Sequence, residues 1–374
     1  MAQNLNSFLE HKSLYYDKID YSIVNRAWQV LEAYVKIPYV IHIIGTNGKG
    51  STGRFLSDIL NQKGFDTLHY SSPHIVEFNE RIWINGENSS NEELESAHNK
   101  LQEVFDDEIL SKLTYFEYTT LLALYLSSSR DYLVLEAGLG GEFDATNVVK
   151  NDLTLVTPIG LDHQNFLGNT IEEITHTKVR SCDNTMIVAS QINKEVYTEL
   201  EIYKEKRKVL FVEDFEIDTS TFDLPEYLKN NLKHSLSVLK YLGLEYKKFA
   251  FPKLFGRCQS LNEKITIDVG HNTLAANVIK EHFMNKKVTL VYNSYNDKDY
   301  KGVLKLLSPI IKSVEIIKLD DQRIVDKDSL IKVCEELKLK YSDFDAIDSH
   351  KEYLVFGSFL VVEEFLRWYK SFEK

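Results

Sequence analysis

Three glycines surround one lysine in the stretch GTNGKGS, Gly45 to Ser51, which directly follows an apolar run. Glycine lets backbone N–H groups approach phosphate oxygens closely, and a following helix points its positive end at the same place. Gly48-Lys49-Gly50-Ser51 therefore predicts a phosphate-binding loop, although Gly45 lies only three residues before Gly48, closer than in the strict P-loop pattern. In such a loop Lys49 contacts the β- and γ-phosphates, and the Ser51 hydroxyl reaches Mg²⁺ or a phosphate oxygen.

Further groups that could do chemistry follow other apolar runs of the first 250 residues. Glu136 ends one run ahead of a glycine-rich loop, and a carboxylate at a strand end beside a phosphate loop is a natural Mg²⁺ ligand. Asp162 and His163 follow another run, and Lys178 lies on the next predicted helix. Taken alone, His163 and Lys178 are as consistent with structural or surface roles as with catalysis.

The last third of the chain has its own candidates. Arg257 lies in the stretch FGRCQS, and an arginine supplied from across a cleft can complete a phosphoryl-transfer site. Asp268 ends a predicted strand ahead of Gly270-His271-Asn272, where Asn272 is also a typical first residue of a helix.

We expect these groups to be positioned by two α/β domains, roughly residues 1–250 and 253–374, with a cleft between them. Short apolar runs alternate with helical periodicity, which is typical of a mostly parallel sheet covered on both faces. The predicted strands are Val40–Ile44, Tyr132–Leu135, Leu153–Thr157, Thr185–Ala189, Val209–Val212, Ile265–Asp268, Val288–Tyr292, Val314–Leu319 and Tyr353–Val355. The predicted helices are Thr52–Lys63, Glu92–Phe105, Phe116–Ser128, Ile171–Ser181, Leu274–Met284, Tyr300–Lys312, Ser329–Leu337 and Ser358–Lys370.

Composition narrows the class of protein. The 374 residues are 43% hydrophobic and carry a net charge of −12, which argues against a general nucleic-acid or membrane-surface binder. No run approaches the ~18 apolar residues that a membrane helix needs. Three widely spaced cysteines form neither a disulfide framework nor a CxxC metal pair, so we expect a protein of the reducing cytoplasm.

Taken together, these segments resemble the folylpolyglutamate synthase/dihydrofolate synthase family of the Mur ligase superfamily. The resemblance covers nearly the whole chain in one order. The matching stretches are GTNGKGS, SSPHIVEFNERIWING, FEYTTLLAL, LEAGLGGEFDATNVV, IGLDHQNFLGNTIEEI, FGRCQS, DVGHN, NDKDY and VFGSF. It implies a P-loop-type domain followed by a smaller Rossmann-like glutamate ligase domain. It also implies an ATP-dependent carboxylate–amine ligase that joins L-glutamate to dihydropteroate or a reduced folate through an acyl phosphate, with Mg²⁺.

The resemblance also implies roles for individual residues, with Lys49, Lys178 and His163 in catalysis. Lys178 matches a family lysine that is carboxylated to a carbamate. The implied ATP contacts are Gly48, Lys49, Gly50, Ser51, Asn231, Arg257, Asp268 and His271. The implied pteroate contacts are Thr114, Tyr115, Phe116, Glu117, Phe143, Asp144 and Ala145. The implied Mg²⁺ positions are Ser51, Ser72, Glu136 and His163.

Two stretches depart from the family pattern, and Thr273 stands where the family usually has proline. Glu142-Phe143 stands where the family usually has Arg-Leu, a change that alters the packing expected around a pterin. Lys178-Val179-Arg180-Ser181 stands where Lys-Ala-Gly-Ile is usual, beside the expected carbamate.

Two other readings remain open from the sequence. A Mur ligase of cell-wall synthesis shares the later domains but carries a further N-terminal domain, for which the 44 residues before Gly45 are too few. A non-catalytic ATP-binding switch leaves Glu136, His163 and Lys178 unexplained. The resemblance favours a monomer.

Overall fold

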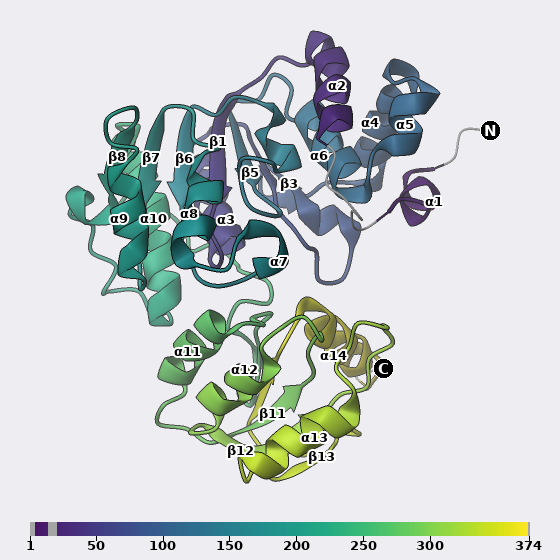
Figure 1. Cartoon of the computed structure of the whole chain (residues 1–374), viewed down its shortest axis with the longest axis vertical. Helices are drawn as coiled ribbons and strands as arrows, with labels where there is room; N and C mark the ends of the chain where they lie inside the picture. The colour runs from purple at the N-terminus through teal and green to yellow at the C-terminus, as the bar shows by residue number, and fades with distance from the viewer. Residues whose placement is uncertain (1–3, 14–20, 373–374) are drawn as a thin grey trace. The chain divides into compact units, whose positions relative to one another are not determined.

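The computed structural model describes residues 4–13 and 21–372, and the chain forms two compact units (Figure 1). The first consists of Met1–Phe222 and Leu228–Pro252, and the second of Asp223–Tyr227 and Lys253–Lys374. Each unit holds one mostly parallel sheet with helices, so the predicted α/β class is confirmed.

The sheet of the first unit has the strand order β4-β3-β2-β5-β1-β6-β7-β8. All neighbours from β2 to β8 pair in parallel, whereas β2–β3 and β3–β4 are antiparallel. The strands are β1 (Tyr39–Ile44), β2 (Thr67–Tyr70), β3 (Ile82–Ile84), β4 (Glu87–Asn88), β5 (Tyr132–Glu136), β6 (Leu153–Val156), β7 (Thr185–Val188) and β8 (Lys208–Phe211). The helices are α1 (Leu5–Glu10), α2 (Ser22–Leu31), α3 (Lys49–Gln62), α4 (Asn91–Val104), α5 (Asp107–Lys112), α6 (Tyr115–Leu126), α7 (Gln164–Leu167), α8 (Ile171–Val179), α9 (Lys194–Glu201) and α10 (Glu226–Tyr241). Short 3₁₀ turns are η1 (Glu32–Tyr34), η2 (Phe78–Arg81), η3 (Ala145–Val148) and η4 (Val212–Phe215).

Alternation along β2 explains why helices lie on both faces of this sheet. Thr67 Oγ1 donates to the Ser57 carbonyl of α3, and on the same face a Cβ at Gly53 would lie 2.3 Å from His69 Nε2. Tyr70 points the other way, because alternate strand residues face opposite sides, and its hydroxyl lies 2.8 Å from Thr119 Oγ1 of α6. Strands covered on both sides must be apolar on both sides, which is the pattern that the sequence shows.

The second unit has the strand order β13-β12-β11-β14-β10-β9, parallel except for β10–β9. Its strands are β9 (Gln259–Asn262), β10 (Ile265–Ile267), β11 (Val288–Tyr292), β12 (Ile311–Ile316), β13 (Tyr341–Asp343) and β14 (Tyr353–Phe356). Its helices are α11 (Thr273–His282), α12 (Tyr300–Leu307), α13 (Lys327–Glu336) and α14 (Phe359–Phe372).

One predicted boundary is wrong. We expected a helix over Tyr300–Lys312 and a strand over Val314–Leu319, but α12 ends at Leu307 and β12 already begins at Ile311. Pro309 explains the shift, since a proline disfavours helical backbone at the residue before it. Several elements have no counterpart among the predicted ones, among them β2, α2 and α10.

Candidate active site

The predicted phosphate-binding loop connects β1 to α3 at the carboxyl edge of the first sheet. Gly45 and Gly48 have φ values of 138° and 88°, a region that side chains other than glycine rarely adopt. A Cβ at Gly45 would also lie 2.0 Å from Thr157 Oγ1. Helical hydrogen bonding starts with Thr52 N donating to Gly48 O, so the amides of the first turn have no acceptor within the helix. Such amides at a helix start are an anion site.

Lys49 and Glu136 face each other at this edge. Lys49 Nζ donates to the carbonyls of Gly45 and Thr46 at 3.2 and 3.3 Å, and it lies 4.0 Å from Glu136 Oε1. Glu136, at the end of β5, is only 5% exposed, and its Oε2 accepts from Ser72 N at 3.3 Å. The parallel register of β1 and β5 produces this meeting, because it pairs Ile43 with Glu136.

Helix α10 holds the start of α3 from 180 residues away in the sequence. Asn231 Nδ2 donates to Ser51 Oγ at 2.7 Å, and Ser235 Oγ donates to the Thr52 carbonyl at 2.8 Å. Ser51 Oγ in turn donates to the Gly48 carbonyl at 3.2 Å. Asn231, a predicted ATP contact, therefore lies against the phosphate loop and orients the hydroxyl of Ser51.

Lys178 reaches the same loop from α8. Its Nζ donates to Gly45 O at 2.9 Å, and the residue is only 4% exposed. Burial, and then the nearby charge of Lys49, lower the pKa of Lys178 from 10.5 to about 7, although Asp162 and Asp144 oppose this shift. The lowered pKa raises the share of Lys178 that is neutral near pH 7, and only a neutral amine can react as a nucleophile.

The two departures from the family pattern meet in space. Glu142 Oε1 and Arg180 Nη2 form an ion pair of 2.5 Å, and Glu142 N donates to the Thr177 carbonyl at 3.1 Å. A Cβ at Gly141 would lie 2.4 Å from the Lys178 carbonyl. The loop after β5 is thus pressed onto the end of α8, and the charges at both unusual positions complement each other.

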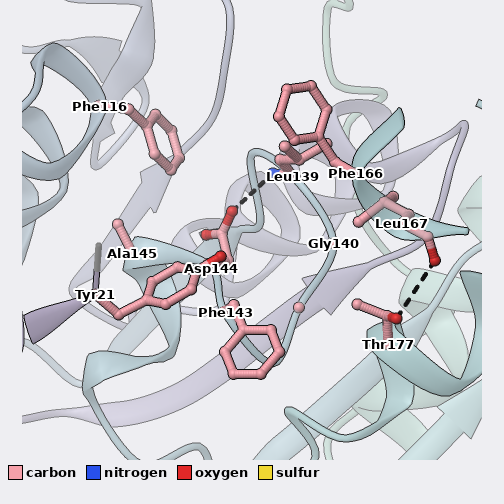
Figure 2. A pocket seen from close by; sticks show the side chains of 11 residues that line it. Tyr21, Phe116, Leu139, Gly140, Phe143, Asp144, Ala145, Phe166, Leu167 and Thr177 are labelled. Atoms are coloured by element: carbon pink, nitrogen blue, oxygen red, sulfur yellow. Dashed lines mark hydrogen bonds between the residues drawn. The ribbon is translucent and has the colours of Figure 1, made fainter. Parts of the chain in front are cut away.

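A pocket of about 80 Å³ opens beside that loop. Figure 2 shows Tyr21 and Phe143 side by side at its wall, with their ring centroids 5.0 Å apart. Phe143 and Phe166 are 51% and 55% exposed, so aromatic surface is available to a flat ring. The lining residues are Tyr21, Phe116, Leu139, Gly140, Gly141, Phe143, Asp144, Ala145, Phe166, Leu167 and Thr177.

Two buried carboxylates accompany this pocket. Asp144 accepts from the Leu139 amide at 2.7 Å (Figure 2) and from Thr146, and burial raises its pKa. Glu117 closes a capping box with Thr114 at the start of α6. Its Oε2 accepts from the Thr114 amide and hydroxyl, whereas Oε1 is buried without a hydrogen-bond partner among the described residues. An orphaned acceptor of this kind suits the N–H groups of a ligand.

His163 lies in the segment that follows β6. It begins the short helix α7 with φ 50°, its side chain is 41% exposed, and its Nε2 lies 3.8 Å from Asp162 Oδ2. Over residues 4–13 and 21–372, no group of three or more His, Cys, Asp or Glu side chains could hold a metal ion. A cation here would depend on hydroxyl and phosphate oxygens beside Glu136, a donor set that fits Mg²⁺.

Asp268 organises the candidate residues of the second unit. It accepts from Tyr227 Oη at 2.8 Å, Cys258 N at 2.8 Å and Gly270 N at 2.7 Å. Arg257 Cζ lies 5.1 Å from the ring of Phe359, and the His271 ring lies 6.5 Å from the same ring. Asn272 caps α11 by accepting from Ala275 N, as the sequence indicated.

Sequence reasoning missed Tyr21, Phe166 and Arg180 as neighbours of the site. Tyr21 precedes α2 and lies far from the glycine-rich loops in the sequence, so no local pattern marks it. The sequence did contain a signal for Arg180. Glu142 and Arg180 both depart from the family pattern and carry opposite charges, which indicates an ion pair between them.

Several curated proteins similar to this chain are named dihydrofolate synthase/folylpolyglutamate synthase. The chain is 30% identical to dihydrofolate synthase/folylpolyglutamate synthase of Haemophilus influenzae over 88% of both chains. It is 33% identical to the Escherichia coli protein of that name, over 73% of this chain and 71% of the relative. No model of a protein family matches the sequence.

Solved structures give the same picture. Helicobacter pylori folylpolyglutamate synthetase is 38% identical, with a TM-score of 0.79 over 98% of both chains. E. coli FolC in complex with DHPP and ADP is 26% identical, with a TM-score of 0.85 over 100% of this chain and 99% of that one. The bifunctional synthase of Yersinia pestis complexed with AMPPNP and Mn ion is 26% identical, with a TM-score of 0.83 over 97% and 96%. No helix within the described residues is long and apolar enough to cross a membrane.

Proposed function

The chain belongs to the dihydrofolate synthase/folylpolyglutamate synthase family, and on that premise we propose that it is an ATP-dependent ligase. It joins L-glutamate to dihydropteroate, to tetrahydrofolate, or to both. The observation that carries this proposal is the meeting of Lys49, Glu136 and Lys178 at one glycine-rich loop, a few residues from an aromatic pocket. The DHPP and ADP of one related structure and the AMPPNP and Mn ion of another support it.

The chemistry requires activation of a carboxylate. A carboxylate oxygen attacks the γ-phosphorus of ATP, and ADP leaves. The amine of glutamate, having lost a proton, then attacks the acyl carbon, and inorganic phosphate leaves with the electron pair of the broken C–O bond. The protein's contribution is to position these groups and to stabilise negative charge, with Lys49 and the α3 amides at the phosphates.

Ser51, Ser72, Glu136 and His163 would hold Mg²⁺, which neutralises phosphate charge when bound. We also propose that Lys178 carries a carbamate, which would add a negative charge to the site. The carbamate forms when the neutral amine adds CO₂ and releases a proton. The lowered pKa supports this assignment, because at pH 7 it makes the reactive neutral amine much more abundant than in an ordinary lysine.

The pteroate end of the substrate belongs in the aromatic pocket. Phe116, Phe143 and Tyr21 offer ring surface for stacking, and Asp144 and Ala145 line the same wall. The free oxygen of Glu117 supplies a hydrogen-bond acceptor nearby. Thr114 and Tyr115 begin the helix that carries Phe116.

For the second domain, residues 253–374, we propose nucleotide contacts from Arg257, Asp268 and His271 and participation in glutamate ligation, while residues 1–250 bind ATP and folate. The three internal donors on Asp268 point to a role in holding the Arg257 loop. We place the protein in the cytoplasm as a monomer, which sedimentation of the purified chain would test.

A substrate panel tests the function. Purified protein with ATP, Mg²⁺ and glutamate is offered dihydropteroate and several reduced folates, and product masses are measured. We expect a mass increase of one glutamyl residue and one ADP per bond formed. A folded protein that forms no glutamyl product from any of these acceptors would overturn the proposal, and ATP hydrolysis without acceptor would favour a switch protein.

A further inference from the structure

Arg81 is a buried cation whose partners carry no negative charge. It ends η2, only 8% exposed, and its Nε donates to His74 Nδ1 at 2.7 Å. Its Cζ lies 5.2 Å from the centroid of the Tyr115 ring. Because arginine stays protonated, this histidine nitrogen must act as the acceptor, so neither the imidazole nor the phenol ring balances the guanidinium charge.

The neighbouring acid does not serve as a counter-ion. The Glu80 carboxylate accepts from the amides of Ile75, Val76 and Glu77 at 2.8, 2.8 and 3.0 Å, and so holds the loop that leads back to Arg81. No other carboxylate within residues 4–13 and 21–372 forms an ion pair with Arg81. An unbalanced buried charge is costly, which indicates that an anion completes the site when it is in use.

Contacts link Arg81 to both halves of the candidate active site. Its carbonyl accepts from Ser71 N at 2.8 Å, next to Ser72, whose amide donates to Glu136 beside Lys49. On the other side, the Tyr115 ring under the guanidinium belongs to α6, whose next residue, Phe116, lines the aromatic pocket.

We infer that the terminal nitrogens of Arg81 bind a carboxylate of the substrates, and that His74 is a positioning residue that fixes the guanidinium plane through Nε. This inference rests on the proposed ligase function and identifies a subsite within it. A planar guanidinium matches a carboxylate with two parallel hydrogen bonds, and the Tyr115 ring beneath it restricts its movement. The carboxylate is either the one to be activated on pteroate or one on the incoming glutamate.

A thermodynamic cycle distinguishes these two carboxylates. It removes the negative charge from the ligand by amidation and the positive charge from the protein by substitution of Arg81. Calorimetry measures the affinity of dihydropteroate and its carboxamide, and of L-glutamate, L-glutamine and the α-amide of glutamate. Mg²⁺ and a non-hydrolysable ATP analogue are present throughout. For the carboxylate that Arg81 binds, we expect the wild-type protein to bind the acid about 10- to 100-fold more tightly than the corresponding amide. This ratio is the size expected for a charge-assisted hydrogen bond. Arg81→Gln should bind acid and amide equally, and Arg81→Lys should retain only part of the preference.

Arg207→Gln is the matched control, since Arg207, which directly precedes β8, also lies over a tyrosine, with Cζ 5.3 Å from the centroid of the Tyr203 ring. It should leave every acid-to-amide ratio unchanged. If Arg81→Gln fails to fold, Arg81→Lys decides the question by its reduced ratio. Ratios that stay at the wild-type value in the folded Arg81 variants would overturn the subsite even if wild type forms glutamyl products. An Arg81-dependent ratio without glutamyl products would instead retain the subsite and overturn the ligase.

Discussion

Lys178→Met should make the protein more stable, and by an amount that depends on pH. Lys178 is 4% exposed, and burial followed by the Lys49 charge lowers its pKa from 10.5 to about 7. Between these two values the unfolded chain binds more protons at this position than the folded chain does. The wild type therefore gains stability as pH rises through this window, and the penalty for burying the ammonium is largest at and below pH 7.

The magnitude follows from the two pKa values. The penalty is about 4 kcal/mol at pH 7 and about 2 kcal/mol at pH 9. Methionine fills similar space without the charge, but it loses the hydrogen bond to Gly45 O, worth about 1 kcal/mol. The advantage of Lys178→Met should therefore be about 3 kcal/mol at pH 7 and should shrink by about 2 kcal/mol at pH 9.

Urea titrations of both proteins at pH 7 and pH 9, in buffer freed of CO₂ to keep the amine unmodified, measure this difference. Lys240→Met is the matched control, because Lys240 is exposed and also donates to a backbone carbonyl, that of Phe215. It reports how far a lysine-to-methionine change alone alters the free energy of unfolding. An advantage for Lys178→Met that is equal at the two pH values would refute the lowered pKa, and with it the physical support for a carbamate.

Other consequences can be measured on single variants. Lys49→Ala should lower turnover at least about 100-fold, because it removes the charge that we propose faces the transferred phosphoryl group; near-normal kcat in a folded variant would contradict the proposed phosphate-binding loop. Asn231→Ala should cost about 1–2 kcal/mol in urea unfolding by removing the 2.7 Å bond to Ser51, and an unchanged midpoint would count against that bond. Arg180→Glu should raise KM for the pteroate substrate several-fold, since an exposed ion pair is worth about 0.2–1 kcal/mol. Adding Glu142→Arg should restore KM, and failure to do so would show that the pair does not position the loop.

Much of the fold was predictable because its causes are local. Strands β1, β5, β6 and β7 lie within one or two residues of their predicted bounds, since each is a short apolar run that must be buried on both faces. Strand β2 was harder to recognise, because Thr67 and His69 are polar yet buried against α3. Its burial depends on a helix packed against it, which periodicity alone does not reveal.

The sequence by itself determined the phosphate loop. Gly45 and Gly48 need positive φ, Lys49 and Ser51 follow at once, and an apolar run precedes them, so all parts of the loop lie between Val40 and Ser51. Glu136 was likewise predictable, because the ends of parallel strands gather at one edge of a sheet.

The tertiary structure alone decided which distant groups act on that loop and how their charges are balanced. Asn231 reaches Ser51 across 180 residues, Glu142 finds Arg180, and Arg81 is buried over Tyr115 without a carboxylate among the described residues. The physical reason is that burial and Coulomb interactions depend on distance in space and on excluded water, and neither quantity is encoded in the spacing of residues along the chain.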